Sequence, residues 1–380
     1  MYLSKIILNN FRSYSNLELN VIPQTGINIF LAPNGKGKTN LLEAISLLSF
    51  PKSFRNLKFN DLVNFDSYYF SIKAELTSNE TYQDFQEVFF DQEKNMNMQV
   101  TYDHKQNQKA FFINQLKVPS KDFMGNFHAI VFNPDDLHLF VLGPQTRRRF
   151  LNTYLSTIYK DYFEAMLKYN QILKSRNKML KDGSINQVLF NMINQNLATY
   201  GSIIYKYRMD FISYINQNLK DTYFSLAPDS QDNEIQIKYL GFTPSEVNEY
   251  RNEYHMNLID NFEKDLRYKS TNNGVHRDDF QIFYDNKPIQ SFYSRGENRT
   301  FVLALKLLQV KYLEQFITYK PVLLLDDVFS ELDEQRRNKL LEFSSSYQTF
   351  ITTVEKAYFD NFSEKFSLFK ITENQISKLK

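Results

Sequence analysis

The chain has 380 residues, a length typical of two to three domains, and 42% of them are hydrophobic, which is enough for a core. Charged residues make up 23%, so wholesale disorder is excluded. The net charge of +2 does not by itself indicate a nucleic-acid or membrane partner. Cysteine is absent, which excludes disulfides, thiolate metal sites and cysteine nucleophiles. No apolar run approaches the ~18 residues of a membrane span, and residues 1–13 lack the apolar core of a signal peptide. We therefore expect a soluble, cytoplasmic protein without a membrane partner.

The first predicted elements are short strands followed by one helix. Apolar patterning predicts strands at Tyr2–Leu8, Leu17–Val21 and Gly26–Leu31, then a glycine-containing turn at Ala32–Gly37 and a helix at Lys38–Phe50. Period-two alternation then predicts antiparallel hairpins built from Phe70–Leu76, Glu87–Asp91, Met96–Tyr102 and Ala110–Asn114. A further apolar strand is expected at Ala129–Phe132, stopped by Asn133-Pro134.

The middle of the chain is helical. Apolar residues at spacings of three to five predict long helices from about Gln145 to Leu180 and from Val188 to Leu219, with a reversal at Lys181–Ser184. We interpret these as an antiparallel helical arm, followed by a third helix at Ser245–Tyr268. Further elements are expected at Phe280–Tyr284 (strand), Glu297–Phe316 (helix), Pro321–Leu325 (strand) and Ile351–Val354 (strand).

The strand, turn and helix around residue 35 carry a phosphate-binding sequence. Ala32-Pro33-Asn34-Gly35-Lys36-Gly37-Lys38-Thr39 fits the phosphate-binding loop, with Ala32 where the first glycine is usual. Backbone N–H groups would surround the phosphates, Lys38 would reach the β- and γ-oxygens, and the Thr39 hydroxyl would hold Mg²⁺. We expect ATP to contact Ala32, Pro33, Asn34, Gly35, Lys36, Gly37, Lys38, Thr39 and Asn40.

A pair of acids follows a buried strand late in the chain. In Val322-Leu323-Leu324-Leu325-Asp326-Asp327, four apolar residues place two carboxylates at the strand end. Asp326 would lie beside Mg²⁺, and Asp327 would position or deprotonate the attacking water. Taken alone, the same pattern fits a strand that ends in solvated acids.

A serine–glycine turn lies between these two motifs in sequence. Ser294-Arg295-Gly296-Glu297 precedes a helix and would present a hydroxyl and free N–H groups to an anion. By itself it is a common helix N-cap. In this order it resembles the signature motif of ABC-type ATPases, in which Ser294, Arg295, Gly296 and Glu297 of one subunit would close over the γ-phosphate held by another. Ser330–Asp333 would then be a D-loop, a subunit-contact segment.

Together these stretches resemble the RecF family of bacterial recombination mediators, within the ABC/SMC-type ATPases. The matching stretches are Tyr2–Tyr14, Asn34–Ala44, Lys52–Arg55, Val131–Leu137, Arg147–Leu151, Gly274–Asp279, Ser294–Glu297 and Leu323–Asp333. The sequence departs from the family pattern at Ala32, at Val275 where proline is usual, and at Asn298 where glutamine is usual.

The resemblance implies an α/β fold: an ABC-type P-loop ATPase head with an antiparallel β lobe and an inserted helical arm. We expect an N-terminal head part at 1–139, the arm at 140–266 and a C-terminal head part at 267–380. The resemblance also implies a weak, DNA-stimulated ATPase that uses ATP and Mg²⁺ and forms a homodimer clamp around two nucleotides. It would bind single-stranded or junction DNA and act with RecO and RecR to load RecA in replication, gap repair and SOS induction.

Three features of the sequence fit more than one interpretation. Arg147, Arg148 and Arg149 and, near the phosphate loop, Lys52 and Arg55 are candidate DNA contacts, although a solvated surface explains such basic residues as well. His276–Asp279 fits a packing or interface role better than a metal site. An ABC transporter subunit and an ATP-sensing scaffold with negligible hydrolysis are alternative functions, and Asp327 in place of the glutamate common in ABC ATPases makes slow turnover plausible.

Overall fold

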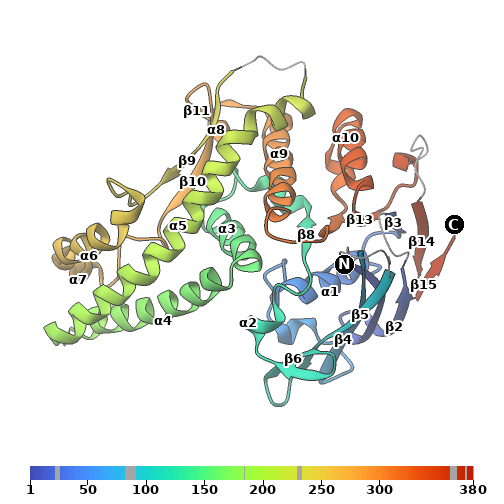
Figure 1. Ribbon diagram of the computed structural model, residues 1–380, viewed down its shortest axis with the longest axis horizontal. Coiled ribbons are helices and arrows are strands. Elements are labelled where there is room, and N and C mark those ends of the chain that lie inside the picture. Colours follow the sequence, from blue (N-terminus) through green and yellow to red (C-terminus); the bar gives the residue numbers. More distant parts are fainter. Residues whose placement is uncertain are drawn as a thin grey trace, which may run out of the picture. The chain divides into compact units, whose positions relative to one another are not determined.

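The computed structural model describes residues 1–21, 26–81, 91–183, 185–228, 233–359, 366–372 and 375–379. The chain forms two compact units, drawn in Figure 1. The head unit combines Met1–Asp136 with Leu313–Lys380, and the arm unit is Leu137–Tyr312. The expected arm at 140–266 therefore lies within a larger unit that also includes residues 267–312. None of the described helices is long and apolar enough to cross a membrane.

The head unit contains a six-stranded, mainly parallel sheet. Its order is β15 (Gln375–Lys378), β14 (Phe366–Thr372), β3 (Gly26–Leu31), β13 (Gln348–Thr353), β12 (Val322–Asp326) and β8 (Ala129–Phe132). All pairs are parallel except β14 with β15. Every residue of β12 and β13 is buried, which explains why both strands lack polar–apolar alternation. The parallel arrangement places the ends of β3, β12 and β13 at one edge of the sheet.

A second six-stranded sheet of the head unit is antiparallel, as the period-two patterning predicts. Its order is β2 (Tyr14–Asn20), β1 (Tyr2–Phe11), β4 (Tyr69–Thr81), β5 (Asp91–Asp103), β6 (Gln108–Ile113) and β7 (Leu116–Val118). Of the strand expected at Glu87–Asp91, only Asp91, the first residue of β5, lies within the described residues.

Helix α1 (Lys38–Ser49) contacts strands of both sheets, and ten of its residues are buried. A helix between two apolar sheet faces needs no polar side, and this explains the run of Leu and Ile in its sequence. The remaining helices of the head are short, apart from α10 against the parallel sheet. Their bounds are η1 (Phe59–Leu62), α2 (Ser120–Phe123), η2 (Pro134–His138, which reaches the arm unit), η4 (Val328–Glu331), α10 (Glu334–Ser345) and η5 (Ala357–Phe359).

The arm unit is built on α3 (Pro144–Ile158), α4 (Lys160–Asp182) and α5 (Gln187–Leu226), and Figure 1 shows α4 and α5 side by side. The single helix expected from Gln145 to Leu180 is wrong at Tyr159, where the backbone is extended. There the Tyr159 ring stacks on Tyr207 at 4.2 Å and its hydroxyl meets that of Tyr312 at 2.8 Å. Tertiary contacts of one tyrosine thus override the helical pattern. Gly183, with a φ of 72°, ends α4.

The rest of the arm unit combines short helices with a three-stranded sheet. Its elements are β9 (Ile235–Leu240), η3 (Val247–Glu249), α6 (Tyr250–Asp260), α7 (Phe262–Tyr268), β10 (Asp279–Tyr284), β11 (Lys287–Pro288), α8 (Ile289–Phe292) and α9 (Arg295–Leu313). The helix expected at Ser245–Tyr268 begins at Tyr250 and is interrupted at Asn261.

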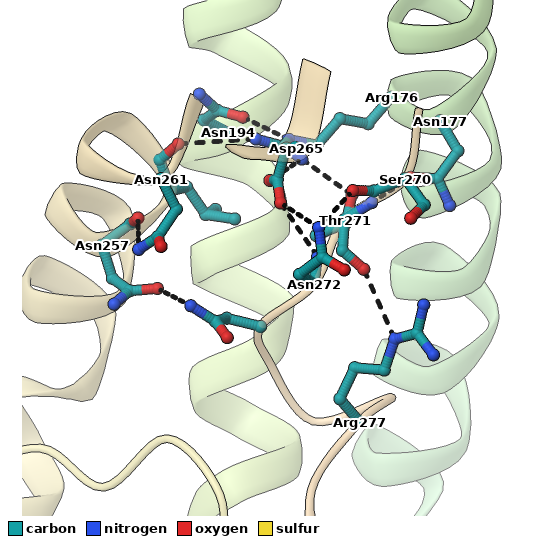
Figure 2. Close-up of polar contacts among 12 residues, drawn as sticks. Arg176, Asn177, Asn194, Asn257, Asn261, Asp265, Ser270, Thr271, Asn272 and Arg277 are labelled. Atoms are coloured by element: carbon teal, nitrogen blue, oxygen red, sulfur yellow. Dashed lines mark hydrogen bonds and ion pairs between the residues drawn. The ribbon is translucent and has the colours of Figure 1, made fainter. Parts of the chain in front are cut away.

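A buried polar cluster ties α7 and the following segment to α4, as Figure 2 shows. The guanidinium of Arg176, in α4, is fully buried and lies 2.7 Å from Asp265, Thr271 and Asn194. Asp265 also accepts hydrogen bonds from the backbone and side chain of Asn272. Because a buried charge is tolerated only when paired, this cluster fixes the chain just before residues 274–278.

Candidate functional site

The segment between β3 and α1 has the backbone of a phosphate-binding loop. Gly35 and Gly37 have φ values of 81° and 92°, a region that residues with a Cβ rarely adopt. A Cβ at Gly37 would lie 2.7 Å from the Ser13 hydroxyl oxygen, and Tyr14 donates a hydrogen bond to the Gly37 carbonyl at 3.1 Å. The turn after β1 therefore packs directly on the loop and requires glycine at position 37.

Ala32, the departure from the usual glycine, causes no backbone strain, because it is not among the residues with a positive φ. Its N–H donates to the Thr353 carbonyl at 3.2 Å, which joins the start of the loop to the end of β13. Alanine is compatible with this conformation, so the substitution leaves the path of the loop intact.

Lys38 occupies the inside of the loop and is 4% exposed. Its Nζ donates to the Ala32 carbonyl at 2.8 Å and to Asn34 Oδ1 at 3.2 Å, and lies 3.4 Å from Asp327 Oδ2. The buried ammonium is thus held by oxygens that a phosphate group could replace.

Thr39 and Asp326 meet at the carboxyl edge of the parallel sheet. The Thr39 hydroxyl donates to Asp326 Oδ1 at 3.0 Å, and that carboxylate is 5% exposed. Burial raises the pKa of Asp326, while hydrogen bonds from Thr352 and Thr39 oppose the rise. A hydroxyl and a carboxylate are the oxygen donors that Mg²⁺ prefers, so these residues fit a magnesium ion beside the phosphate loop.

Asp327, the second acid, has a left-handed backbone with a φ of 49°. Its N–H donates to the Thr352 carbonyl at 3.1 Å, and its side chain, 30% exposed, points to Lys38. The carboxylate is therefore accessible to water while lying beside the phosphate loop.

A buried carboxylate on α1 organises the two neighbouring segments. Glu43 is fully buried, accepts from Arg12 Nε at 3.2 Å and is hydrogen-bonded by the Ser53 hydroxyl. Ser53 Oγ in turn accepts from the N–H of Arg55, whose positive charge slightly opposes the rise that burial causes in the pKa of Asp326. Glu43 thus fixes the loop that carries Lys52 and Arg55, both exposed.

The serine–glycine turn lies at the start of α9 in the arm unit. Ser294 and Glu297 form a reciprocal capping box: Glu297 Oε2 accepts from the Ser294 N–H at 2.8 Å and hydroxyl at 2.7 Å, and Ser294 Oγ accepts from the Glu297 N–H at 3.3 Å. Asn298, 6% exposed, donates to the carbonyls of Tyr293 and Ser294. Ser294 and Gly296 are exposed at the helix N-terminus, where an anion is stabilised.

The segment after the two acids is a 3₁₀ turn that leads into α10. Ser330 donates to the Asp327 carbonyl at 2.8 Å, and Asp333 accepts from the Arg336 N–H as the N-cap of α10. The segment proposed as a D-loop is therefore tied to Asp327 itself.

His276 has a structural environment. Its Nε2 lies 3.1 Å from the Thr271 carbonyl, which can only accept, so Nε2 carries the proton and Nδ1 accepts from the Tyr169 hydroxyl at 2.7 Å. Burial lowers the pKa of His276 to about 4, so the ring is neutral at pH 7. Within the described ranges, no group of three or more His, Asp or Glu side chains could hold a metal ion. These contacts support packing.

The arginines proposed for DNA differ in their surroundings. Arg147 is 4% exposed, pairs with both carboxylate oxygens of Asp279 at 2.8 Å and donates to three carbonyls. Arg148 donates to the carbonyls of Arg277 and Asp278, and Arg149 is partly exposed. DNA contact by Arg147 would require a buried ion pair to break, so Arg149, Lys52 and Arg55 are better placed for phosphates.

Comparison with known proteins gives one family and close relatives. A family model described as the RecF/RecN/SMC N terminal domain matches residues 2–378. The DNA replication and repair protein RecF of Thermoanaerobacter pseudethanolicus is 32% identical over 364 residues, 94% of this chain and 95% of that protein. RecF of Streptococcus pneumoniae is 32% identical over 381 residues, 99% of each chain.

Solved structures also show similarity to RecF. A structure of the recombination mediator protein RecF with ATP, in the RecFOR pathway, has a TM-score of 0.86 and 32% identity, with 100% of this chain and 98% of that chain covered. An Smc head bound to a domain of ScpA has a TM-score of 0.53 at 14% identity, which shows a shared fold alone. The expected α/β ATPase head with an antiparallel lobe and a helical arm is confirmed.

Proposed function

This chain belongs to the RecF family of the RecF/RecN/SMC ATPases, and we propose that it is an ATP-binding DNA replication and repair protein acting as a recombination mediator. One observation carries the proposal: the Thr39 hydroxyl and Asp326, 287 positions apart in sequence, meet at 3.0 Å beside the loop that encloses Lys38. The process comes from the relatives, which are named DNA replication and repair proteins.

The nucleotide would occupy the loop before α1. Its phosphates would accept from backbone N–H groups of residues 34–40 and from Lys38, while Thr39 and Asp326 would hold Mg²⁺. When bound, Mg²⁺ would neutralise the negative charge of the phosphates. Lys38 would exchange its contact with Asp327 for phosphate oxygens, which leaves the Asp327 carboxylate to orient the attacking water.

Hydrolysis is proposed to be weak and stimulated by DNA. Aspartate is one methylene shorter than the glutamate usual in ABC ATPases, so Asp327 reaches a water molecule less well. The alternative, a scaffold that senses ATP without hydrolysing it, rests on the same shorter acid. The transporter alternative has no support from the comparisons, which match the RecF/RecN/SMC family.

Ser294 is proposed to act on the nucleotide of a second copy of the chain. In this proposal, ATP closes a homodimer into a DNA clamp and hydrolysis opens it. The N-terminus of α9 supports the proposal, since Ser294, just before the helix, and Gly296, in its first turn, are exposed there. The clamp would bind single-stranded or junction DNA through Arg149, Lys52 and Arg55, with Arg148 nearby, and act with RecO and RecR to load RecA in gap repair and SOS induction.

Light scattering of the purified protein tests the proposed function. We expect the mass to double with Mg-ATP, and a short duplex with a single-stranded end to bind the dimer. Lys38→Met is the control, because without the ammonium the variant loses ATP binding and stays monomeric. A wild-type protein that neither binds ATP nor changes its mass on ATP addition contradicts the proposal.

A further inference from the structure

Thr352, in β13, contacts both acids at the end of β12, although no motif includes it. Parallel pairing sets Thr352 directly beside Asp326, and its side chain is fully buried. The Thr352 hydroxyl oxygen lies 2.7 Å from Asp326 Oδ1 and 3.1 Å from the backbone nitrogen of Asp327.

The hydroxyl has one proton, and the geometry decides where it points. The alternative acceptor, the Leu325 carbonyl, is 3.5 Å away, so the proton goes to Asp326 at 2.7 Å. A lone pair of the same oxygen accepts from the Asp327 N–H. Thr352 is thus a donor to the first acid and an acceptor from the second.

Each contact fixes a feature that the proposed site uses. Asp326 Oδ1 accepts from Thr352 and from Thr39, so the carboxylate is turned toward the threonine at the start of α1. The Asp327 N–H is shared between the carbonyl and hydroxyl oxygens of Thr352, which supports its left-handed backbone. That conformation directs the Asp327 carboxylate to Lys38.

Packing alone does not require a hydroxyl at this position. Every residue of β13 is buried, and Phe350 and Ile351 precede Thr352. A valine would fill nearly the same volume without a polar atom, and a buried hydroxyl is unfavourable unless hydrogen-bonded. Both bonding capacities of this hydroxyl are directed to the acids.

We propose that Thr352 is a positioning residue, whose hydroxyl holds Asp326 in the orientation that serves Mg²⁺ and holds Asp327 beside Lys38. The inference rests on the proposed ATP-binding function. It predicts that removing the hydroxyl reduces the gain in ATP affinity that Mg²⁺ provides. The affinity of the loop for ATP in the absence of Mg²⁺ should stay unchanged.

The test compares Thr352→Val with Thr352→Ser and with a matched control, Thr349→Val. Thr349 is equally buried on the same strand, but its hydroxyl donates to main-chain carbonyls of Ser344 and Tyr347. Binding of a fluorescent ATP analogue is measured with EDTA and with Mg²⁺, alongside the Mg²⁺ concentration for half-maximal hydrolysis.

We expect Thr352→Val to lose about 10-fold or more of the Mg²⁺-dependent gain in affinity, the effect typical of removing a partner of a metal-binding group. Its half-saturating Mg²⁺ concentration should rise, and its affinity in EDTA should match the wild type. Thr352→Ser should restore the gain, and Thr349→Val should behave as wild type.

Several results would overturn the inference. An unchanged Mg²⁺ gain in Thr352→Val, or an equal loss in Thr349→Val, would leave Thr352 as a packing residue. If Thr352→Val does not fold, Thr352→Ser is compared with Thr352→Ala, because these two variants differ only in the hydroxyl. Equal gains in ATP affinity on Mg²⁺ addition in both variants would contradict the inference. If the wild-type protein binds no ATP, the proposed function is refuted as well. If the wild type binds ATP and Thr352→Val shows the same Mg²⁺-dependent gain in affinity, only the inference about Thr352 is refuted.

Discussion

Arg147→Ala distinguishes a packing role of this arginine from a role in DNA binding. The guanidinium is 4% exposed and makes two hydrogen bonds of 2.8 Å to Asp279, and its Nη1 donates to carbonyls after β8, including that of Leu142 at 2.6 Å. The substitution would leave the Asp279 carboxylate and the carbonyls without this partner. We therefore expect a large loss of stability in the arm unit.

The size of the effect follows from the burial of the pair. Removing one partner of a buried ion pair costs about 3–5 kcal/mol. For a unit of roughly 150–250 residues, each kcal/mol lowers the melting temperature by about 2–4 °C, so the expected decrease is about 6 °C or more. Arg149→Ala is the control, because its partly exposed side chain should change stability by less than about 0.5 kcal/mol.

The assay combines thermal unfolding, followed by circular dichroism, with DNA binding at two salt concentrations. Arg147→Ala should melt early, and Arg149→Ala should melt like the wild type but bind DNA more weakly with a shallower salt dependence. The reasoning is refuted if Arg147→Ala melts with the wild type and is the variant that loses DNA affinity.

Three further predictions concern the loop, the second acid and the arm. Gly37→Ala should destabilise the protein by at least about 1 kcal/mol, measured by urea unfolding, because alanine is strained at a φ of 92° and its Cβ would contact Ser13. A variant as stable as the wild type would contradict this loop geometry. Asp327→Asn should retain ATP but lower the single-turnover rate by about 10²-fold or more, whereas an unchanged rate favours the ATP-sensing scaffold. In the folded protein, His276 has a pKa of about 4, below the usual value near 6.5. Between these two values the unfolded chain binds more protons than the folded protein, so the stability falls as the pH drops from 6.5 to 4. The contribution of neutral His276 to the free energy of unfolding, about 3 kcal/mol, is complete above pH 6.5 and lost below pH 4. His276→Gln should therefore flatten the pH dependence of the free energy of unfolding measured in urea. An unchanged slope would contradict a buried, neutral His276.

Much of the fold was predictable because local patterns and packing agree. The strand at Gly26–Leu31, the helix from Lys38 and the strand at Ala129–Phe132 follow directly from apolar runs bounded by glycine or proline. The short edge strands β7 and β15 and helix α10 were not predicted. Strand β15 and helix α10 are largely polar in sequence and β7 has only three residues, so the conformation of all three depends on neighbouring elements.

The candidate site was predictable only where its residues lie within motifs. Lys38, Thr39 and Asp326 are identified by spacing, but Thr352 is a single threonine whose role depends on strand register. The same limit affects Arg147: three consecutive arginines resemble a phosphate-binding surface, yet on a helix successive side chains point in different directions. The first faces Asp279, the second the carbonyls of 277 and 278, and the third is partly exposed.

Sedimentation of the Ser294→Arg variant tests most directly whether two copies of the chain share each nucleotide. Ser294 lies just before α9 rather than in the phosphate loop, so the variant should bind ATP with nearly wild-type affinity. It should nevertheless remain a monomer with Mg-ATP, under conditions in which the wild type sediments as a dimer. A Ser294→Arg protein that dimerises normally with ATP would contradict the account.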